Sequence, residues 1–171
     1  EIKTLEVSKA SELYNEYLGT TNSALKDSYK QDLIKNYQNS YYLTLIELSE
    51  SFDEAKANDL FTNAARDENY EIIVALADIY KSKGDNEKAS GLYGFVIENK
   101  DTAGADTYSK ALLGKASISQ DQSFADAYLS IRQDEDLLKT LEASGELAEI
   151  ESNVDKEARE GNANVLSVLF D

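Results

Sequence analysis

Cysteine, histidine, methionine, tryptophan and proline are all missing from this chain of 171 residues. Without cysteine and histidine, the chain has no disulfide, no thiol nucleophile, no imidazole general base and no thiolate or imidazole zinc ligand. Serine–histidine triads and cysteine proteases are therefore excluded, and we expect no metal site and no cofactor. Paired carboxylates remain as a catalytic option, but no local pattern marks such a pair among the 33 acidic residues, so we expect a non-enzymatic protein.

Sequence motifs for phosphate and calcium binding are also missing. The segment Gly91-Leu92-Tyr93-Gly94 lies within a predicted helix and lacks the lysine and the spacing of a phosphate-binding loop. The acidic runs 101–106 and 134–136 do not follow the calcium-loop pattern, which ends in a late glutamate. We interpret both runs as solvated acids near helix starts.

Few residues interrupt a helix, because proline is absent and glycine numbers only 8. Alanine, leucine, glutamate and lysine are abundant and favour helices nearly throughout, so the chain is predicted to be all-α. Its length is sufficient to bury a core and suits a single domain, residues 1–171.

Positive charge is scarce: 17 basic residues stand against 33 acidic ones, which gives a net charge of -16 and a pI of about 4.3. No cluster of lysine and arginine is present, so nucleic acid and anionic lipid surfaces are poor partners. The longest apolar runs, 72–77 and 168–170, are far shorter than the roughly 20 residues that span a bilayer, and no membrane span is expected. Because the sequence starts at Glu1 without methionine, we expect that it has been trimmed, which leaves a bacterial periplasm and the cytoplasm both open.

The stretch 73–96 has the clearest pattern in the chain. Apolar residues recur at helical spacing on each side of Gly84-Asp85-Asn86, a sequence typical of a turn. The pattern predicts two short amphipathic helices that fold back on each other, with alanines where they cross. The apolar positions are Ile73, Leu76, Ala77, Tyr80, Ala89, Tyr93 and Val96.

The same pattern recurs on both sides of this stretch. Leu45 precedes Ala77 by 32 residues, and Ala57 precedes Ala89 by the same distance. A later copy contains Leu113-Gly114 and lies further along because the segment 101–106 lengthens the connection. The approximate helix pairs are 8–38, 39–66, 70–100, 105–133 and 136–171.

This spacing resembles tetratricopeptide (TPR) and Sel1-like repeats, most closely over residues 39–133. The resemblance implies a right-handed α-solenoid and a non-enzymatic scaffold or adaptor that binds a peptide or protein in its concave groove. It is compatible with a role in a bacterial envelope or exopolysaccharide-secretion assembly. The groove residues that the resemblance implies are Tyr42, Ile46, Glu71, Val74, Asp78, Tyr108 and Lys115.

Local signals also predict helix starts and core aromatics. Tyr41, Tyr80 and Tyr93 fall on positions expected in the core. Gly19 is expected to end the first helix, and a last helix is expected from about Asp155 to Phe170. The expected helix caps are Ser8 or Ser11, Asn22 or Ser23, Asp53, Asn69 and Asp101.

Three other functions remain open at this point. The chain could be a helical module of a glycan-acting protein, in which Tyr42 and Tyr108 stack on sugar, or a hydrolase with two carboxylates in one cleft. Residues 134–171 hold eleven acids and three bases and are either a solvated face or a surface that steers a basic partner. The identity of the partner and the oligomeric state are not determined by the sequence.

Overall fold

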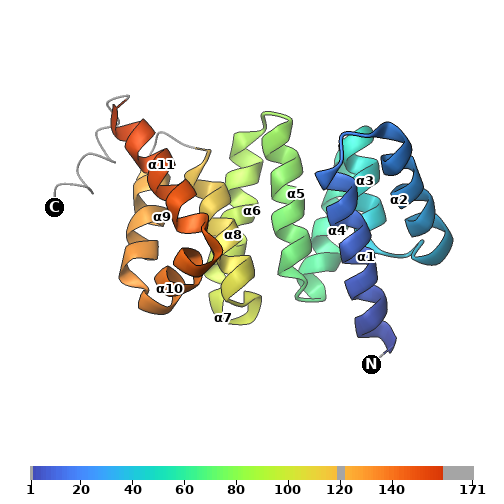
Figure 1. Ribbon diagram of the computed structural model, residues 1–171, viewed down its shortest axis with the longest axis horizontal. Coiled ribbons are helices and arrows are strands. Elements are labelled where there is room, and N and C mark those ends of the chain that lie inside the picture. Colours follow the sequence, from blue (N-terminus) through green and yellow to red (C-terminus); the bar gives the residue numbers. More distant parts are fainter. Residues whose placement is uncertain (1, 119–121, 160–171) are drawn as a thin grey trace. The chain divides into compact units, whose positions relative to one another are not determined.

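The computed structural model describes residues 2–118 and 122–159, and every regular element in these ranges is a helix (Figure 1). The predicted all-α class is therefore confirmed. The helices form two compact units, Glu1–Asp67 and Glu68–Asp171, each of which is described by itself. No helix among the described residues has the length and apolar character needed to cross a membrane.

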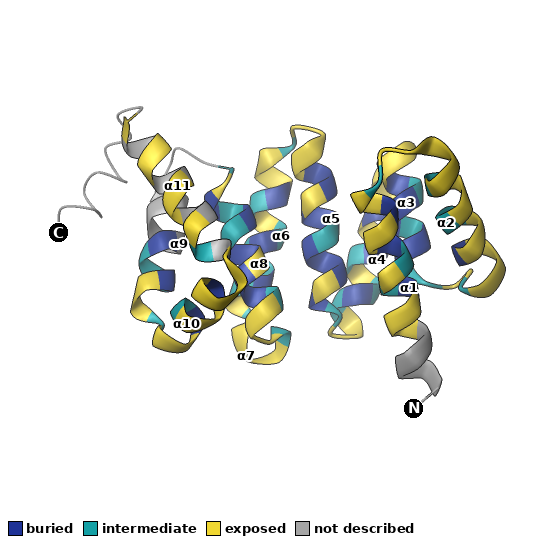
Figure 2. Cartoon of the chain, viewed as in Figure 1, coloured by how far each residue is buried: buried dark blue, intermediate teal, exposed yellow. Residues whose placement is uncertain are grey.

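The first unit contains α1 (Ile2–Gly19), α2 (Ser23–Asn36), α3 (Tyr41–Glu50) and α4 (Glu54–Arg66). Helix α1 packs against both α2 and α3, and α3 packs against α4. The core is built mainly by α3, whose buried residues include Leu45, Ile46 and Leu48. Figure 2 shows that α2, by contrast, is largely exposed; Leu33 is its buried residue among those described.

Side-chain caps fix the starts of the helices in the first unit. Asn22 Oδ1 accepts from the backbone N–H groups of Ala24 and Leu25, and Asp53 Oδ1 accepts from that of Lys56 at 2.8 Å. The predicted caps at Asn22 and Asp53 are thus confirmed, as is the end of α1 at Gly19.

The predicted caps at Ser8 and Ser11 are wrong, because both residues lie inside α1. No proline or glycine precedes them, so nothing in the sequence stops the helix from extending back to Ile2.

Aromatic residues join the helices of the first unit. The rings of Tyr14 and Tyr42 lie 5.4 Å apart, and the Tyr17 hydroxyl donates to Glu50 Oε1 at 3.2 Å. Burial raises the pKa of Tyr17. Tyr41, which was expected in the core, is only half-buried, and its hydroxyl donates to the Asp67 carboxylate.

The second unit contains α5 (Tyr70–Ser82), α6 (Asn86–Glu98), α7 (Lys100–Ala103), α8 (Ala105–Ala116), α9 (Gln122–Gln133), α10 (Glu135–Ser144) and α11 (Glu146–Arg159). Helix α6 packs against α5 on one side and α8 on the other, and α5 and α8 also touch each other. Most residues of α5 are buried, as expected for a helix that is apolar nearly all round.

The turn predicted in the middle of the chain is present between α5 and α6. Gly84 adopts a φ of +84°, a conformation that residues with a Cβ rarely adopt. Asp85 then caps α6 by accepting from the backbone N–H of Lys88 at 3.2 Å. Tyr80 and Tyr93, one in each helix, are both buried as predicted.

A second core cluster joins α8, α9 and α10. Its buried residues include Tyr108, Ile131 and Leu141. Lys100 of α7 lies over the Tyr108 ring at 5.0 Å and pairs with the Asp134 carboxylate, which itself caps α10.

Three expectations for the second unit have different outcomes. Asn69 caps α5 as predicted, since its Oδ1 accepts from the backbone N–H of Ile72 at 3.4 Å. The predicted cap at Asp101 is wrong, because Asp101 lies within the short helix α7. The last expected helix begins within α11, and its part beyond Arg159 lies outside the described residues.

Candidate functional site

A shallow groove of about 210 Å³ lies between α5 and α8 of the second unit. On both helices its lining residues recur at intervals of three or four, so each helix contributes one face. We call this site the α5–α8 groove. It is lined by Val74, Asp78, Lys81, Lys110, Leu113, Gly114 and Ser117.

The spacing of the groove walls depends on Tyr93 of α6. Its ring passes so close to Gly114 that a Cβ atom added there would lie 2.4 Å from the nearest ring carbon. The side chain is fully buried, and its hydroxyl donates to Asp78 Oδ1 on the opposite wall. Glycine at position 114 is therefore needed for close approach, although its backbone is an ordinary helix.

The polar groups of the groove interact with one another and with nearby residues. Lys81 Nζ donates to Ser117 Oγ at 2.7 Å, which joins the two walls. Lys110 Nζ pairs with Asp106 Oδ2 at 3.0 Å, one turn earlier on α8. The lining of the groove therefore combines two ammonium groups with the apolar side chains of Val74 and Leu113.

Asp78 has the most unusual electrostatic environment of the groove. Much of the residue is exposed, but its carboxylate faces the buried Tyr93 hydroxyl. The loss of water at the carboxylate raises its pKa, and the hydrogen bond from Tyr93 and the charges of Lys81 and Lys110 offset only part of this effect. Burial and the Asp78 charge also raise the pKa of Tyr93.

The structure places the residues of the expected groove in three different settings. Val74 and Asp78 line the α5–α8 groove, and Glu71 is exposed one turn before Val74. Tyr42 and Ile46 are packed inside the first unit, with 5% and 0% of their surfaces exposed.

The two expected residues of α8 also lie outside the groove lining. Tyr108 is 6% exposed and belongs to the second core cluster. Lys115 is half-buried, and its Nζ lies close to Gly94 of α6.

Sequence reasoning missed several groove residues, although a signal for some of them was present. Lys81 follows Val74 by seven residues and so shares its helix face. Lys110 and Ser117 are polar at positions where the repeats that the sequence resembles have large apolar residues, and in the structure both line the groove.

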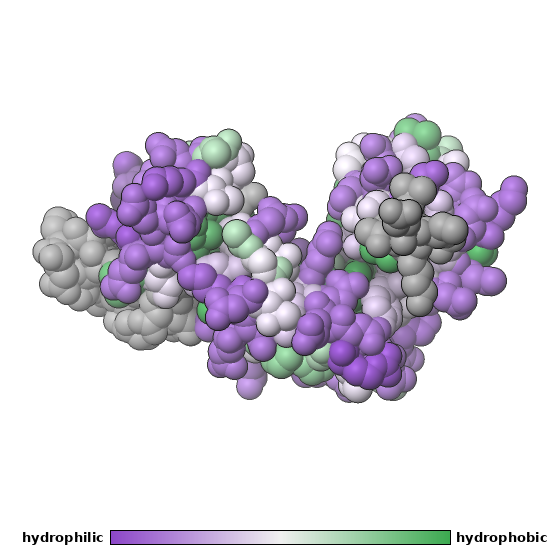
Figure 3. All heavy atoms as spheres, turned by 90° about the horizontal axis from the view of Figure 1, so that it is seen from below, coloured by the Kyte–Doolittle hydropathy of each residue, from purple (hydrophilic) through white to green (hydrophobic). Residues whose placement is uncertain are grey.

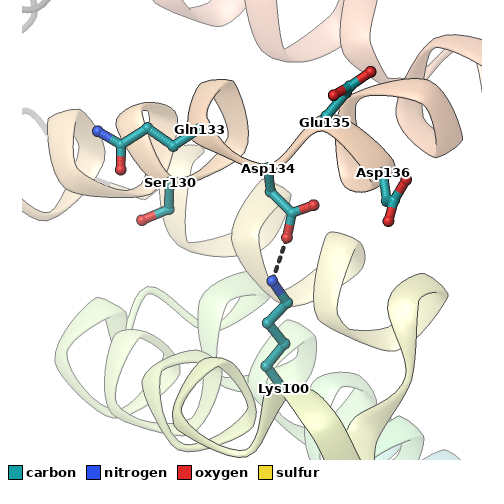
Figure 4. A pocket seen from close by; sticks show the side chains of 6 residues that line it. All are labelled: Lys100, Ser130, Gln133, Asp134, Glu135 and Asp136. Atoms are coloured by element: carbon teal, nitrogen blue, oxygen red, sulfur yellow. Dashed lines mark hydrogen bonds and ion pairs between the residues drawn. The ribbon is translucent and has the colours of Figure 1, made fainter.

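A second depression, of about 440 Å³, lies beside the start of α10 (Figure 4). Asp134 points to Lys100 and pairs with it, whereas the side chains of Glu135 and Asp136 point in other directions. The carboxylates therefore do not converge, and none of the acidic residues described by the structure form a group of three that could hold a metal ion. We interpret the acidic residues of this depression as solvated groups at the start of α10.

On the face seen in Figure 3, hydrophilic side chains predominate and hydrophobic ones form small separate areas. No protein-family model, curated protein or solved structure matches this chain. Among the residues that the structure describes, the α5–α8 groove is therefore the candidate binding site.

Proposed function

We propose that the chain is a non-enzymatic adaptor, an α-solenoid of the TPR or Sel1-like kind, which binds a peptide or helix of a partner protein in the α5–α8 groove. The observation that carries this proposal is a lining that combines the apolar side chains of Val74 and Leu113 with polar groups from both helices. Grooves of this composition bind protein segments, since apolar contacts supply affinity and polar contacts fix orientation.

The arrangement of helices supports the same proposal. The groove walls are α5 and α8, which are the first helices of consecutive predicted pairs, and α6 packs behind both of them. In helical repeat proteins, the first helices of neighbouring repeats commonly form the binding surface. Tyr93 and Gly114 hold the walls in place, so the groove exists before a partner binds.

A protein partner is favoured over a glycan. Sugar stacking requires an aromatic ring with one open face, and the two tyrosines expected to stack, Tyr42 and Tyr108, are buried in their own units. The α5–α8 groove has no aromatic residue in its lining.

The proposal is tested by selecting peptides from a random 12-residue display library on the wild-type protein. Their affinities are then measured for two charge-reversal variants, Lys110→Glu and Lys139→Glu. The variants are matched, because each lysine is exposed and pairs with an acid four residues earlier on its helix, Asp106 and Glu135 respectively. Lys110 lines the groove and Lys139 lies on α10.

We expect the selected peptides to bind Lys139→Glu as they bind the wild type, and to bind Lys110→Glu with an affinity that differs by about fivefold or more. Amide shifts caused by the peptides should map to α5 and α8. Peptides that bind both variants equally, or shifts confined to other helices, would refute the groove as the binding site.

A further inference from the structure

Asp78 is an unexpected residue on the wall of an apolar groove. An ionised carboxylate is stabilised by water, and any apolar group that enters the groove beside Val74 and Leu113 removes water from this wall. The hydrogen bond from Tyr93 approaches from the buried side, because the Tyr93 side chain is itself buried. The exposed side of the carboxylate is the part that a partner would cover.

Three groups face Asp78 from the helices around it. Tyr93 of α6 donates a hydrogen bond, and Lys81 of α5 and Lys110 of α8 supply positive charge. All three favour the ionised form, yet burial of the carboxylate already raises the pKa of Asp78. The protein groups therefore do not replace the water that the carboxylate has lost.

From this geometry we propose that filling the α5–α8 groove with an apolar group of the partner is linked to the uptake of a proton by Asp78. This inference rests on the proposed function and adds a property to the same groove: the partner binds more tightly as the pH falls. The step is a simple protonation. Asp78 takes a proton from solvent, and the Tyr93 hydroxyl continues to donate a hydrogen bond to the carboxyl group.

The direction of the effect follows from linkage. If binding raises the pKa of Asp78 further, the complex holds more protons than the free protein between the two pKa values, and affinity increases as the pH decreases through that range. One proton can change the affinity by at most about tenfold per pH unit. We expect binding to be about threefold or more tighter at pH 5 than at pH 8.

The experiment uses N-phenyl-1-naphthylamine, an uncharged apolar fluorophore, so that any dependence on pH between 5 and 8 comes from the protein. Its dissociation constant is measured with the wild type, with Asp78→Asn, and with Asp106→Asn as the control. Asp106 is an exposed acid of α8 that pairs with Lys110 but does not line the groove. Circular dichroism at each pH confirms that the helices are intact.

We expect the wild type and Asp106→Asn to bind the fluorophore more tightly at pH 5 than at pH 8. Asp78→Asn should bind it with one affinity across the range, close to that of the wild type at pH 5. A carbon-13 titration of the wild type should show a higher pKa for the Asp78 carboxyl when the fluorophore is bound.

Two results would overturn the inference. The first is fluorophore binding that does not change with pH, or that changes equally in the wild type and Asp78→Asn. The second is no fluorophore binding at any pH. If the peptide selection succeeds, the first result refutes the role of Asp78 and leaves the proposed function intact. If the peptide selection fails, both the proposed function and the role of Asp78 are refuted.

Discussion

Replacing Gly114 by alanine should destabilise the protein, although alanine is the better helix former. The added Cβ would lie 2.4 Å, 2.5 Å and 2.9 Å from three atoms of the Tyr93 ring. Tyr93 is fully buried and hydrogen-bonded to Asp78, so its ring cannot move without displacing neighbouring groups. The clash has to be relieved by moving α8 away from α6 or by displacing the ring.

The net cost can be worked from three contributions. Overpacking of a well-packed core costs about 1–3 kcal/mol, and breaking the Tyr93–Asp78 hydrogen bond costs about 1 kcal/mol more. Against these costs, replacing glycine with alanine inside a helix stabilises the folded state by about 1 kcal/mol. We therefore expect Gly114→Ala to lower the free energy of unfolding by about 1–3 kcal/mol, or roughly 1 M in the urea midpoint.

The assay is urea unfolding followed by circular dichroism, with Gly91→Ala as the matched control. Gly91 also lies inside a helix, but a Cβ atom there would meet nothing within 4 Å. This control should be more stable than the wild type by about 0.5–1 kcal/mol. The variant Tyr93→Leu should reduce the cost of Gly114→Ala, because a smaller side chain leaves room for the methyl group. If Gly114→Ala stabilises as much as Gly91→Ala does, the close approach of the ring is refuted.

The remaining predictions concern the contribution of two helix caps to stability and, for one of them, its dependence on pH. Asp53→Ala should lower the free energy of unfolding by about 1 kcal/mol in urea, because the backbone N–H of Lys56 loses its acceptor. The pKa of Asp134 is lowered by its hydrogen bonds with Lys100 and with the backbone of Leu137, so its stabilising effect is present above the ordinary aspartate pKa and is lost as the pH falls below it. The urea midpoints of the wild type and Asp134→Ala should therefore differ at pH 7 and converge toward pH 3; a constant difference would contradict this account.

The fold could be predicted from the sequence wherever the signals are local. The turn at Gly84 and the caps at Asp53 and Asn69 depend on residues within four positions of each other, and all three are present in the structure. The failed predictions at Ser8 and Asp101 are of another kind. Serine and aspartate favour a helix start without forcing one. Nothing before Ser8 breaks the helix, and α7 already begins at Lys100, after Asn99, so that Asp101 falls inside it.

The candidate site could be predicted only in part, because helix faces are ambiguous when apolar residues surround the helix. In α3, Tyr41 and Tyr42 are adjacent, and the sequence does not show which of them points inward. The structure buries Tyr42 against Tyr14 and leaves Tyr41 half-buried beside Asp67. On α5 the expected groove residues Val74 and Asp78 do line the groove, since the polar Asp78 marks the exposed side of a largely apolar helix.

The Tyr93 side chain makes three distant positions of the sequence interdependent. An aromatic ring at position 93 requires glycine at 114, and its hydroxyl requires an acceptor such as the carboxylate at 78. In a library of random variants, a residue with a Cβ at 114 should survive mainly together with a side chain smaller than tyrosine at 93. A groove of different width could be engineered by exchanging residues 93 and 114 together, while every side chain that faces the partner, apart from the one at 114, stays as it is.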